Sequence, residues 1–239
     1  DGHWWILFHG YEKNFHTLGR QTLMQPVIWT DDDWYKLPEG TNVEKKINRP
    51  TGENISEPHE RSDDFSSPEL GIQWQFFKNY DPDRFDLTGK SLIMEAKGIS
   101  PGNSPPLLVN PGHHAYELVT EVQIDDNAKA GLVLFYNENA FVGVAMDALQ
   151  QYVYRSDRGE IKQKENKIGN RFYLKLVNDQ HEVNTFTSSD GENWQKSPLS
   201  MEVSGLHHNV FGGFLSLRAG IFAAGTGKVE FFNFEYNPL

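Results

Sequence analysis

Short apolar runs separated by turn residues are the feature that most constrains the fold of this chain. Between residues 114 and 124, an apolar residue or threonine occupies every second position from Tyr116 to Ile124. Successive side chains of a strand point to opposite faces, so a period of two predicts a strand with one buried face. Gly, Asn, Asp and Pro interrupt the runs, and helical periodicity is hard to find. This pattern predicts an all-β fold, either a sandwich or a barrel.

The predicted strands beyond residue 90 are numerous enough for two facing sheets. Several pairs flank short polar turns, such as Asn137-Glu138-Asn139 and Asp179-Gln180-His181, which predicts hairpins. We expect strands over residues 91–96, 114–124, 130–136, 140–146, 152–156, 160–164, 171–178, 182–188, 215–223 and 228–236.

The chain divides into three parts along its length. Residues 1–36 carry a β-hairpin pattern, with strands over residues 3–9 and 17–29. Residues 37–61 are rich in Pro, Gly and Asn, which predicts a linker. Residues 62–239 form the β-sandwich unit. Because the strand pattern starts at the first residue, we expect its partner strands to belong to further polypeptide, and we interpret the chain as the C-terminal part of a larger protein.

Charge and composition exclude several classes of partner and site. The 239 residues have a formal net charge of −11, and no basic run is longer than Lys45-Lys46. Nucleic acids and anionic membranes are bound through Lys and Arg patches, so we expect neither as a partner. The chain has no Cys, which excludes disulfides, thiolate metal sites and a Cys nucleophile. No apolar run approaches the roughly 18 residues of a membrane-spanning helix.

Two sets of segments carry a family resemblance that covers nearly the whole chain. The first set is Trp4–Gly10, Leu18–Trp29 and Asp33-Trp34. It resembles the last propeller blade of the glycoside hydrolases of family 43, which include β-xylosidases and α-L-arabinofuranosidases. The second set is Asp63–Phe65, Leu70–Gln75, Ala130–Asn137 and Val229–Tyr236. It is similar to the β-sandwich that follows the propeller in the two-domain members of that family.

The resemblance implies both a fold and an activity. The implied fold is a two-sheet concanavalin A-like β-sandwich, or jelly roll, preceded by a hairpin of a five-bladed β-propeller. Members of the family hydrolyse xylosidic or arabinofuranosidic bonds of hemicellulose with inversion, and they use three carboxylates of the earlier blades. No Asp or Glu of this chain matches those positions, so we expect it to lack the catalytic acid and base and to be inactive alone.

The expected partners follow from the same resemblance. They are the N-terminal propeller part of the same enzyme and plant cell-wall oligosaccharides. The sandwich would buttress the propeller and form one wall of the sugar pocket. A pocket closed on one side favours hydrolysis at the ends of polysaccharide chains. We expect a secreted or periplasmic bacterial protein, and the absence of Cys is compatible with export.

Three residues are candidates for contact with the substrate. Arg20 matches an arginine that points into the family's pocket, where a guanidinium donates to sugar hydroxyls and keeps a carboxylate ionised. The alternative is an ordinary exposed arginine at a strand end. Phe214 matches a phenylalanine that limits the depth of the pocket. The spacing departs from the family's, so Phe211 is the second candidate for this role, and core packing is the alternative for both.

Calcium is the one cofactor that the resemblance and the acidic residues suggest. His9 matches a histidine that contacts a water or a calcium ion in the propeller's central cavity, and its alternative is a core histidine between strands. Asp63 and Asp64 lie at the entry to the sandwich and Glu235 near its exit, where they are candidates to share a calcium ion with backbone carbonyls. The alternative for these carboxylates is solvated loop charge.

Two rival interpretations of the function remain open. The first is a non-catalytic carbohydrate-binding module that stacks sugars on an exposed aromatic strip. The candidates for this strip are Trp74, Phe76, Phe77 and Tyr80. Period-two core packing explains Trp74, Phe76 and Tyr80 as well. The second is a structural domain without sugar contact. The adjacent imidazoles His113-His114 and His207-His208 are poor metal chelates, because neighbouring residues of a strand face opposite ways.

Overall fold

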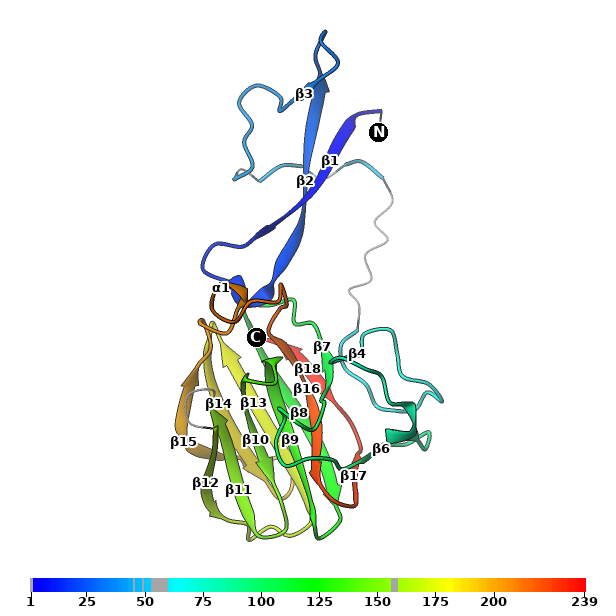
Figure 1. The fold of residues 1–239 in the computed structure, drawn as a ribbon, viewed down its shortest axis with the longest axis vertical. Helices are drawn as coiled ribbons and strands as arrows, with labels where there is room; N and C mark the ends of the chain where they lie inside the picture. Colours follow the sequence, from blue (N-terminus) through cyan, green and yellow to red (C-terminus); the bar gives the residue numbers. More distant parts are fainter. Residues whose placement is uncertain (1, 45, 49, 53–59, 156–158) are drawn as a thin grey trace.

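Two antiparallel sheets pack face to face in the C-terminal part of the molecule, and a third, three-stranded sheet stands beyond one end of them (Figure 1). The structure is a computed structural model, and it describes residues 2–44, 46–48, 50–52, 60–155 and 159–239. The predicted all-β sandwich is confirmed. Among the described residues, no helix has the length and hydropathy to cross a membrane.

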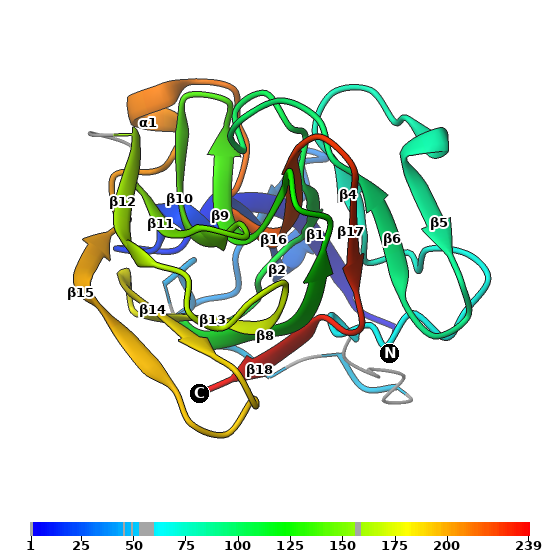
Figure 2. The same ribbon diagram turned by 90° about the horizontal axis from the view of Figure 1, so that it is seen from below.

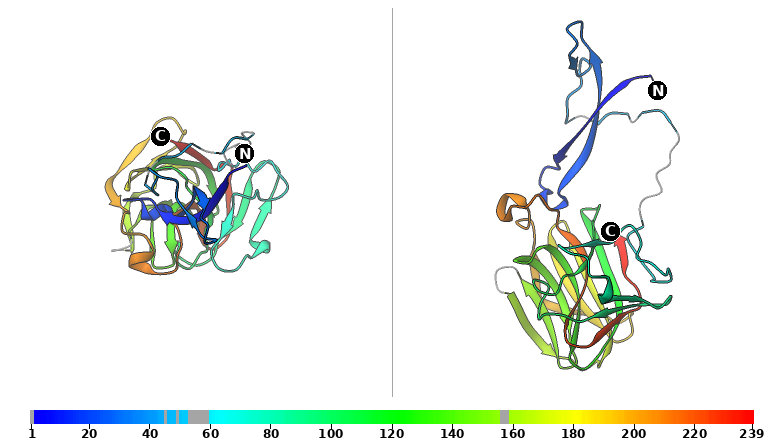
Figure 3. Two further views of the ribbon diagram at one scale, coloured as in Figure 1. Left: turned by 90° about the horizontal axis from the view of Figure 1, so that it is seen from above. Right: turned by 45° about the vertical axis from the view of Figure 1, so that its right-hand side comes forward.

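The N-terminal sheet consists of β1 (Trp4–Tyr11), β2 (Arg20–Trp29) and β3 (Tyr35–Lys36). Strands β1 and β2 are antiparallel, with Trp4 opposite Val27 at one end and Tyr11 opposite Arg20 at the other. This sheet reaches away from the sandwich and touches it only at its base, as Figures 1 and 3 show. The described residues between β3 and Glu60 contain no helix or strand.

The start of β2 differs from the sequence-based expectation of a strand from residue 17. Residues His16–Leu18 form a 3-10 turn, η1, and the strand begins only at Arg20. The turn is closed by hydrogen bonds of 3.0 Å from Leu18 N to Phe15 O and from Gly19 N to His16 O. These backbone groups are therefore satisfied locally and are not available for strand pairing.

One face of the sandwich is a seven-stranded sheet with the order β12-β11-β10-β9-β16-β7-β4. All its neighbouring pairs are antiparallel, and β9 to β12 follow one another as successive hairpins, as the turn residues predicted. Its strands are β4 (Gln75–Phe76), β7 (Leu107–Val109), β9 (Ala128–Asn137), β10 (Ala140–Met146), β11 (Gln150–Arg155), β12 (Gly159–Glu165) and β16 (Arg218–Gly225).

The other face is an eight-stranded sheet with the order β15-β14-β13-β8-β17-β6-β5, in which β18 also pairs with β8. Its strands are β5 (Phe85–Leu87), β6 (Leu92–Glu95), β8 (Ala115–Ile124), β13 (Arg171–Asp179), β14 (Glu182–Ser188), β15 (Gln195–Glu202), β17 (Lys228–Phe231) and β18 (Glu235–Pro238). The short helical turns are η2 (Pro82–Arg84) and α1 (His208–Phe211).

Inward-pointing side chains of the two sheets form one apolar core. Strand β8 alternates buried and half-buried residues along most of its length, as its period of two predicted. Leu118, Leu134 and Phe172 are fully buried members of this core. Complete burial of such a side chain stabilises the fold by about 1.5–3 kcal/mol. Figure 2 shows the two sheets from below, facing each other.

The prediction of one strand over residues 228–236 is wrong, because the chain forms two strands there. Strand β17 pairs with the end of β8 and β18 with its first half. Between them, Asn233 accepts hydrogen bonds from Glu121 N through Oδ1 (2.7 Å) and from Thr120 Oγ1 through its backbone oxygen (2.6 Å). The asparagine side chain thus replaces regular backbone pairing, and it produces a break that alternation alone does not reveal.

Arg84 ties the two sheets together at one edge of the sandwich. Its side chain is buried, and its guanidinium donates to the backbone oxygens of Glu95 in β6 (2.9 Å) and Ala223 in β16 (2.9 Å). Further bonds reach Pro105 O (2.5 Å) and Ser104 Oγ (2.8 Å). Because the planar guanidinium serves four acceptors at once, the shorter ammonium of a lysine cannot replace it.

We expect Arg84→Lys to lower the free energy of unfolding by about 2–4 kcal/mol, since it leaves buried carbonyl groups unsatisfied. Urea denaturation followed by tryptophan fluorescence measures this loss. Arg171→Lys is the matched control, because Arg171 is exposed and its ion pair with Glu121 lies at the surface. The control is expected to change stability by less than about 0.5 kcal/mol. Equal effects of the two variants would contradict the role of Arg84.

Candidate functional site

A backbone hydrogen bond and a close approach of the two backbones are among the contacts that join the N-terminal segment to the sandwich. Leu217 N donates to Thr17 O across 2.7 Å. Gly19 has a φ of 73°, and a Cβ at this position would lie 2.9 Å from Ser216 Cβ. Glycine meets both requirements without strain, because it tolerates a positive φ and has no side chain. The two segments are thereby held together, which fixes where β2 begins.

Arg20, the first residue of β2, lies beside the loop that follows α1. Its guanidinium carbon is 4.2 Å from the ring centroid of Phe214 and 5.7 Å from that of Tyr11. Contacts between a cation and an aromatic face are favourable by about 0.5–2 kcal/mol. The structure therefore brings together two of the predicted substrate-contacting residues, Arg20 and Phe214, which lie far apart in the sequence.

The backbone of the loop after α1 presents the Phe214 ring to solvent. Gly212, Gly213 and Phe214 have φ values of 69°, 85° and 54°, and Phe214 is 66% exposed. A left-handed φ costs a residue other than glycine roughly 1–2 kcal/mol, so the surrounding contacts must hold Phe214 in place. Tyr136 supplies such contacts, since its hydroxyl donates to Gly212 O and accepts from Leu215 N at 3.3 Å.

Phe211, the second candidate for the pocket phenylalanine, lies elsewhere on the same loop. Its ring centroid is 6.1 Å from that of Tyr136, and it is 37% exposed. Of the two predicted phenylalanines, the structure places Phe214 against Arg20 and Phe211 against Tyr136. The geometry thus favours Phe214 as the residue that acts together with Arg20.

A stack of three rings completes this junction. The His208 imidazole lies between the rings of Tyr11 (4.8 Å, interplanar angle 10°) and Phe214 (5.2 Å, 24°). Within the described part of the chain, Tyr11 Oη and His208 Nδ1 are buried without a hydrogen-bond partner. Sequence analysis did not single out Tyr11, and it considered His208 only as a metal ligand. The sequence signal that could have revealed this stack is the high density of aromatic and His residues around Tyr11 and around His208, two segments that the fold brings together.

A second group of rings fixes the turn before β2 on the sandwich. The Phe15 ring stacks on His114 at 3.6 Å and lies 4.9 Å from His181. Thr17 Oγ1 and His181 Nε2 are hydrogen-bonded at 3.0 Å, and Glu12 lies 3.0 Å from the His114 ring. Burial lowers the pKa of His181, and the nearby Glu202 carboxylate opposes that shift. Burial at this contact therefore favours the neutral form of the His181 imidazole.

The described residues contain no group of three or more His, Asp or Glu that could hold a metal ion. His9 is exposed on β1 opposite Thr22. It lies on the same face of the hairpin as Tyr11, because both occupy alternate positions of one strand. Its predicted role in a central cavity stays a prediction.

The carboxylates at the ends of the sandwich are engaged by N–H donors. Asp63 accepts hydrogen bonds from Phe65 N (2.8 Å), Trp74 Nε1 (2.7 Å) and Gln73 Nε2 (3.2 Å). Its backbone also pairs with Phe234. These N–H donors occupy most of the lone pairs of the Asp63 carboxylate.

The two other carboxylates of this set are also bonded locally. Asp64 accepts from Ser66 N at 3.0 Å, and hydrogen bonds of the Ser66 side chain and then of its backbone hold the pKa of the Asp64 carboxyl below the usual value. Glu235 accepts from Asn233 Nδ2 at 2.8 Å. The calcium site at these carboxylates stays a prediction.

The Arg20 junction has the chemistry of a recognition surface. The guanidinium offers several N–H donors, and the Phe214 ring next to it offers an exposed apolar face. Such a pair suits a ligand that has hydroxyl groups on its edge and C–H groups on its face. It supplies no pair of carboxylates for general acid and base catalysis.

Comparisons with known proteins agree with this fold. The sequence profile of the β-xylosidase C-terminal concanavalin A-like domain matches residues 62–237. A curated relative, the non-reducing end α-L-arabinofuranosidase BoGH43B of Bacteroides ovatus, is 28% identical over 148 residues, which are 56% of this chain and 28% of that protein. The family resemblance predicted from sequence is confirmed.

Solved structures of similar fold cover the N-terminal sheet as well as the sandwich. The family 43 protein BlXynB from Bacillus licheniformis is 21% identical with a TM-score of 0.84, over 100% of this chain and 51% of its own. The xylan β-1,4-xylosidase from Bacillus halodurans is 20% identical with a TM-score of 0.84, over 99% and 51%. The chain therefore spans about half the length of these solved structures.

The burial of His181 predicts that acid weakens the junction. Its pKa is lower in the folded chain than in the unfolded one, so between the two values the unfolded state binds more protons. We expect stability to fall as the pH drops below about 6.5, and to be unaffected by this group at higher pH. Urea denaturation at about pH 7.5 and about pH 5.5 measures the change.

His181→Asn is the informative variant for this prediction, because it keeps a polar partner for Thr17 and cannot be protonated. We expect the loss of stability on acidification to be smaller in the variant than in the parent chain. The same loss in both would contradict the assignment to His181 and point to His113 or His207, whose pKa values burial also lowers.

Proposed function

Because the chain belongs to glycoside hydrolase family 43 as a β-xylosidase-type C-terminal concanavalin A-like domain, we propose that it is the non-catalytic part of a hemicellulose-degrading enzyme. In this proposal, the sandwich supports a β-propeller that carries the catalytic carboxylates. The N-terminal sheet supplies strands to the last blade of that propeller. The junction of Arg20 and Phe214 forms one wall of the sugar pocket.

Exposed apolar side chains on the N-terminal sheet support its role as part of a blade. Trp4, Leu7 and Trp34 are 64%, 68% and 66% exposed. Side chains on both faces of β1 contribute, since Trp4 and Leu7 occupy positions of opposite parity. A sheet with apolar residues on both faces is normally covered on both, which is the situation inside a propeller.

The observation that carries the proposal is the contact of 4.2 Å between the Arg20 guanidinium and the Phe214 ring. One residue comes from the N-terminal sheet and the other from a loop of the sandwich, so the contact joins the two parts at a shared recognition surface. A ring beside a guanidinium limits the depth of a pocket while the guanidinium binds hydroxyls. A pocket with such a wall suits hydrolysis at the ends of polysaccharide chains.

The substrate class follows from the relatives. One is named a non-reducing end α-L-arabinofuranosidase and another a xylan β-1,4-xylosidase. We propose terminal xylosyl or arabinofuranosyl residues of plant cell-wall oligosaccharides as substrates, released with inversion by the propeller part. Secretion or a periplasmic location remains a prediction.

The structure buries Trp74, one of the aromatic residues that the rival binding module would use to stack sugars. Trp74 is 6% exposed and lies in the core, where its Nε1 donates to Asp63. It offers no face to a sugar, as the core interpretation predicted. Tyr80 is 55% exposed and packs against Phe76, with 4.3 Å between the ring centroids. With Trp74 buried, Tyr80 does not form an exposed strip together with it.

We expect the chain of 239 residues to show no hydrolysis of aryl β-xylosides or aryl α-L-arabinofuranosides, because it supplies no acid and base pair. The same assay on the longer polypeptide with its N-terminal part is expected to show release of the aryl group. Hydrolysis by the isolated chain at a comparable rate would overturn the proposal.

We expect Arg20→Ala to lower kcat/KM of the longer enzyme by about 10- to 100-fold, which corresponds to the loss of a charged hydrogen bond. Arg171→Ala is the matched control, because Arg171 also lies over an aromatic ring, that of Phe232 at 4.4 Å, on the outer face of the sandwich. Unchanged turnover in Arg20→Ala would favour a structural domain without sugar contact.

A further inference from the structure

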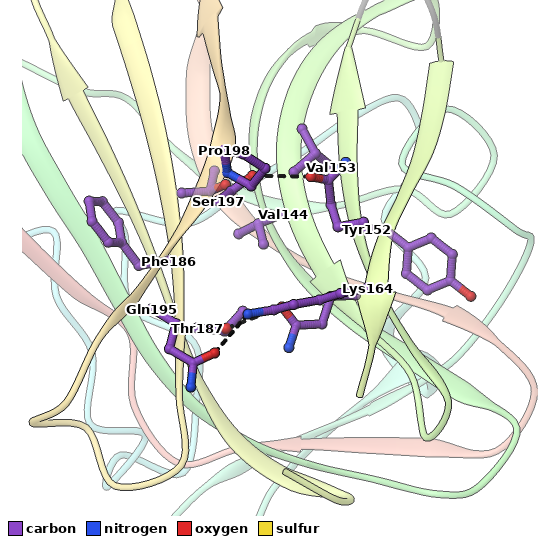
Figure 4. Close-up of a pocket in the computed structure, with 12 residues that line it drawn as sticks. Val144, Tyr152, Val153, Lys164, Phe186, Thr187, Gln195, Ser197 and Pro198 are labelled. Carbon is purple, nitrogen blue, oxygen red and sulfur yellow. Dashed lines mark hydrogen bonds between the residues drawn. The ribbon is translucent and has the colours of Figure 1, made fainter. Parts of the chain in front are cut away.

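A second candidate binding site lies between the two sheets, on the side where the sandwich is open. The edge strands β12 and β15 lie next to each other there, and strands β10, β11 and β14 form the floor of a cleft of about 100 Å³ (Figure 4). Sequence analysis assigned no role to this region. The junction with the N-terminal sheet uses other elements, namely η1, α1 and the loop before β16.

The inner end of the cleft is polar. Gln151, Thr185 and Thr187 line it and are 6%, 0% and 4% exposed. Thr187 Oγ1 donates to Gln151 Oε1 at 3.2 Å. Thr185 Oγ1 is buried and has no hydrogen-bond partner in the described part of the chain. A buried hydroxyl without a partner is unfavourable, which points to a ligand or water that satisfies it.

Amide and hydroxyl groups surround the mouth of the cleft. Lys164 Nζ donates to Gln195 Oε1 at 2.7 Å, and Ser197 Oγ donates to Gln163 Oε1 at 3.4 Å. Both hydrogen bonds cross from β12 to β15, and Figure 4 shows the Lys164–Gln195 pair at the opening. Among the described residues that line the cleft, only Lys164 is charged, and its ammonium group is hydrogen-bonded to the Gln195 amide oxygen. The site therefore favours a neutral ligand over an anion.

The remaining walls are apolar. Val144, Val153 and Pro198 line the cleft, and in Figure 4 the ring of Tyr152 points away from them. A neutral ligand that has hydroxyl groups on some edges and C–H groups on its faces matches this combination of amides, hydroxyls and aliphatic walls. A sugar ring has this chemistry.

We propose that the cleft between β12 and β15 binds one neutral sugar residue, such as the terminal ring or a branch of a cell-wall oligosaccharide. The volume is smaller than the about 150 Å³ that encloses a benzene molecule, so the ring enters from the mouth and is only partly enclosed. Its hydroxyls reach Thr185 Oγ1 and the amide of Gln151. The site is separate from the Arg20 junction and does not depend on the function proposed for that junction.

The test is a titration of the isotopically labelled chain with D-xylose, L-arabinose and xylobiose, followed by amide chemical shifts. We expect saturable shifts confined to residues of β11, β12, β14 and β15, with a Kd of roughly 1–10 mM for one partly enclosed ring. Thr185→Val keeps the side-chain volume and removes the hydroxyl. It is expected to fold as stably as the parent and to bind at least about tenfold more weakly.

Thr226→Val is the matched control, because Thr226 is an exposed threonine in the turn between β16 and β17. It is expected to bind like the parent. The proposal is overturned if no sugar produces saturable shifts, if Thr185→Val binds as tightly as the parent, or if glycerol gives equal shifts at equal concentration. Shifts confined to Arg20 and Phe214 would also overturn it, while leaving the proposed function intact.

Discussion

The joint between Thr17 and Leu217, together with the close approach of Gly19 to Ser216, is the constraint on which the candidate site depends. It places the first residue of β2 beside the loop after α1, so that Arg20 lies over Phe214. Gly19 and this backbone bond thus help to determine how Arg20 and Phe214 meet.

Stacked rings reinforce that joint where an ordinary apolar core is absent. Phe15 with His114 and Tyr11 with His208 stack across the boundary between the N-terminal sheet and the sandwich. Imidazoles suit this position because they stack like aromatic rings and still bond to water or hydroxyls at their edges. Their use makes the boundary sensitive to protonation, since burial lowers the pKa of His181 and of His207.

Local patterns predicted the strands well, and they failed where a side chain replaced a backbone bond. The period of two located β8 and the successive hairpins, because it follows directly from strand geometry. Asn233 divides the last predicted strand through contacts with residues of β8 that no local pattern reveals. The resemblance predicted Arg20 and Phe214 separately, but their contact, the His208 stack and the orphaned hydroxyl of Thr185 depend on long-range packing.

The two parts of the molecule differ in how fully they bury their own apolar residues. The sandwich closes a core in which Leu118, Phe172 and their neighbours are fully buried. The N-terminal sheet leaves Trp4 and Trp34 more than half exposed, and a small sheet without a covered face is only marginally stable. Covering each such side chain contributes about 1.5–3 kcal/mol. Under the proposed function, the last blade of the propeller supplies this cover.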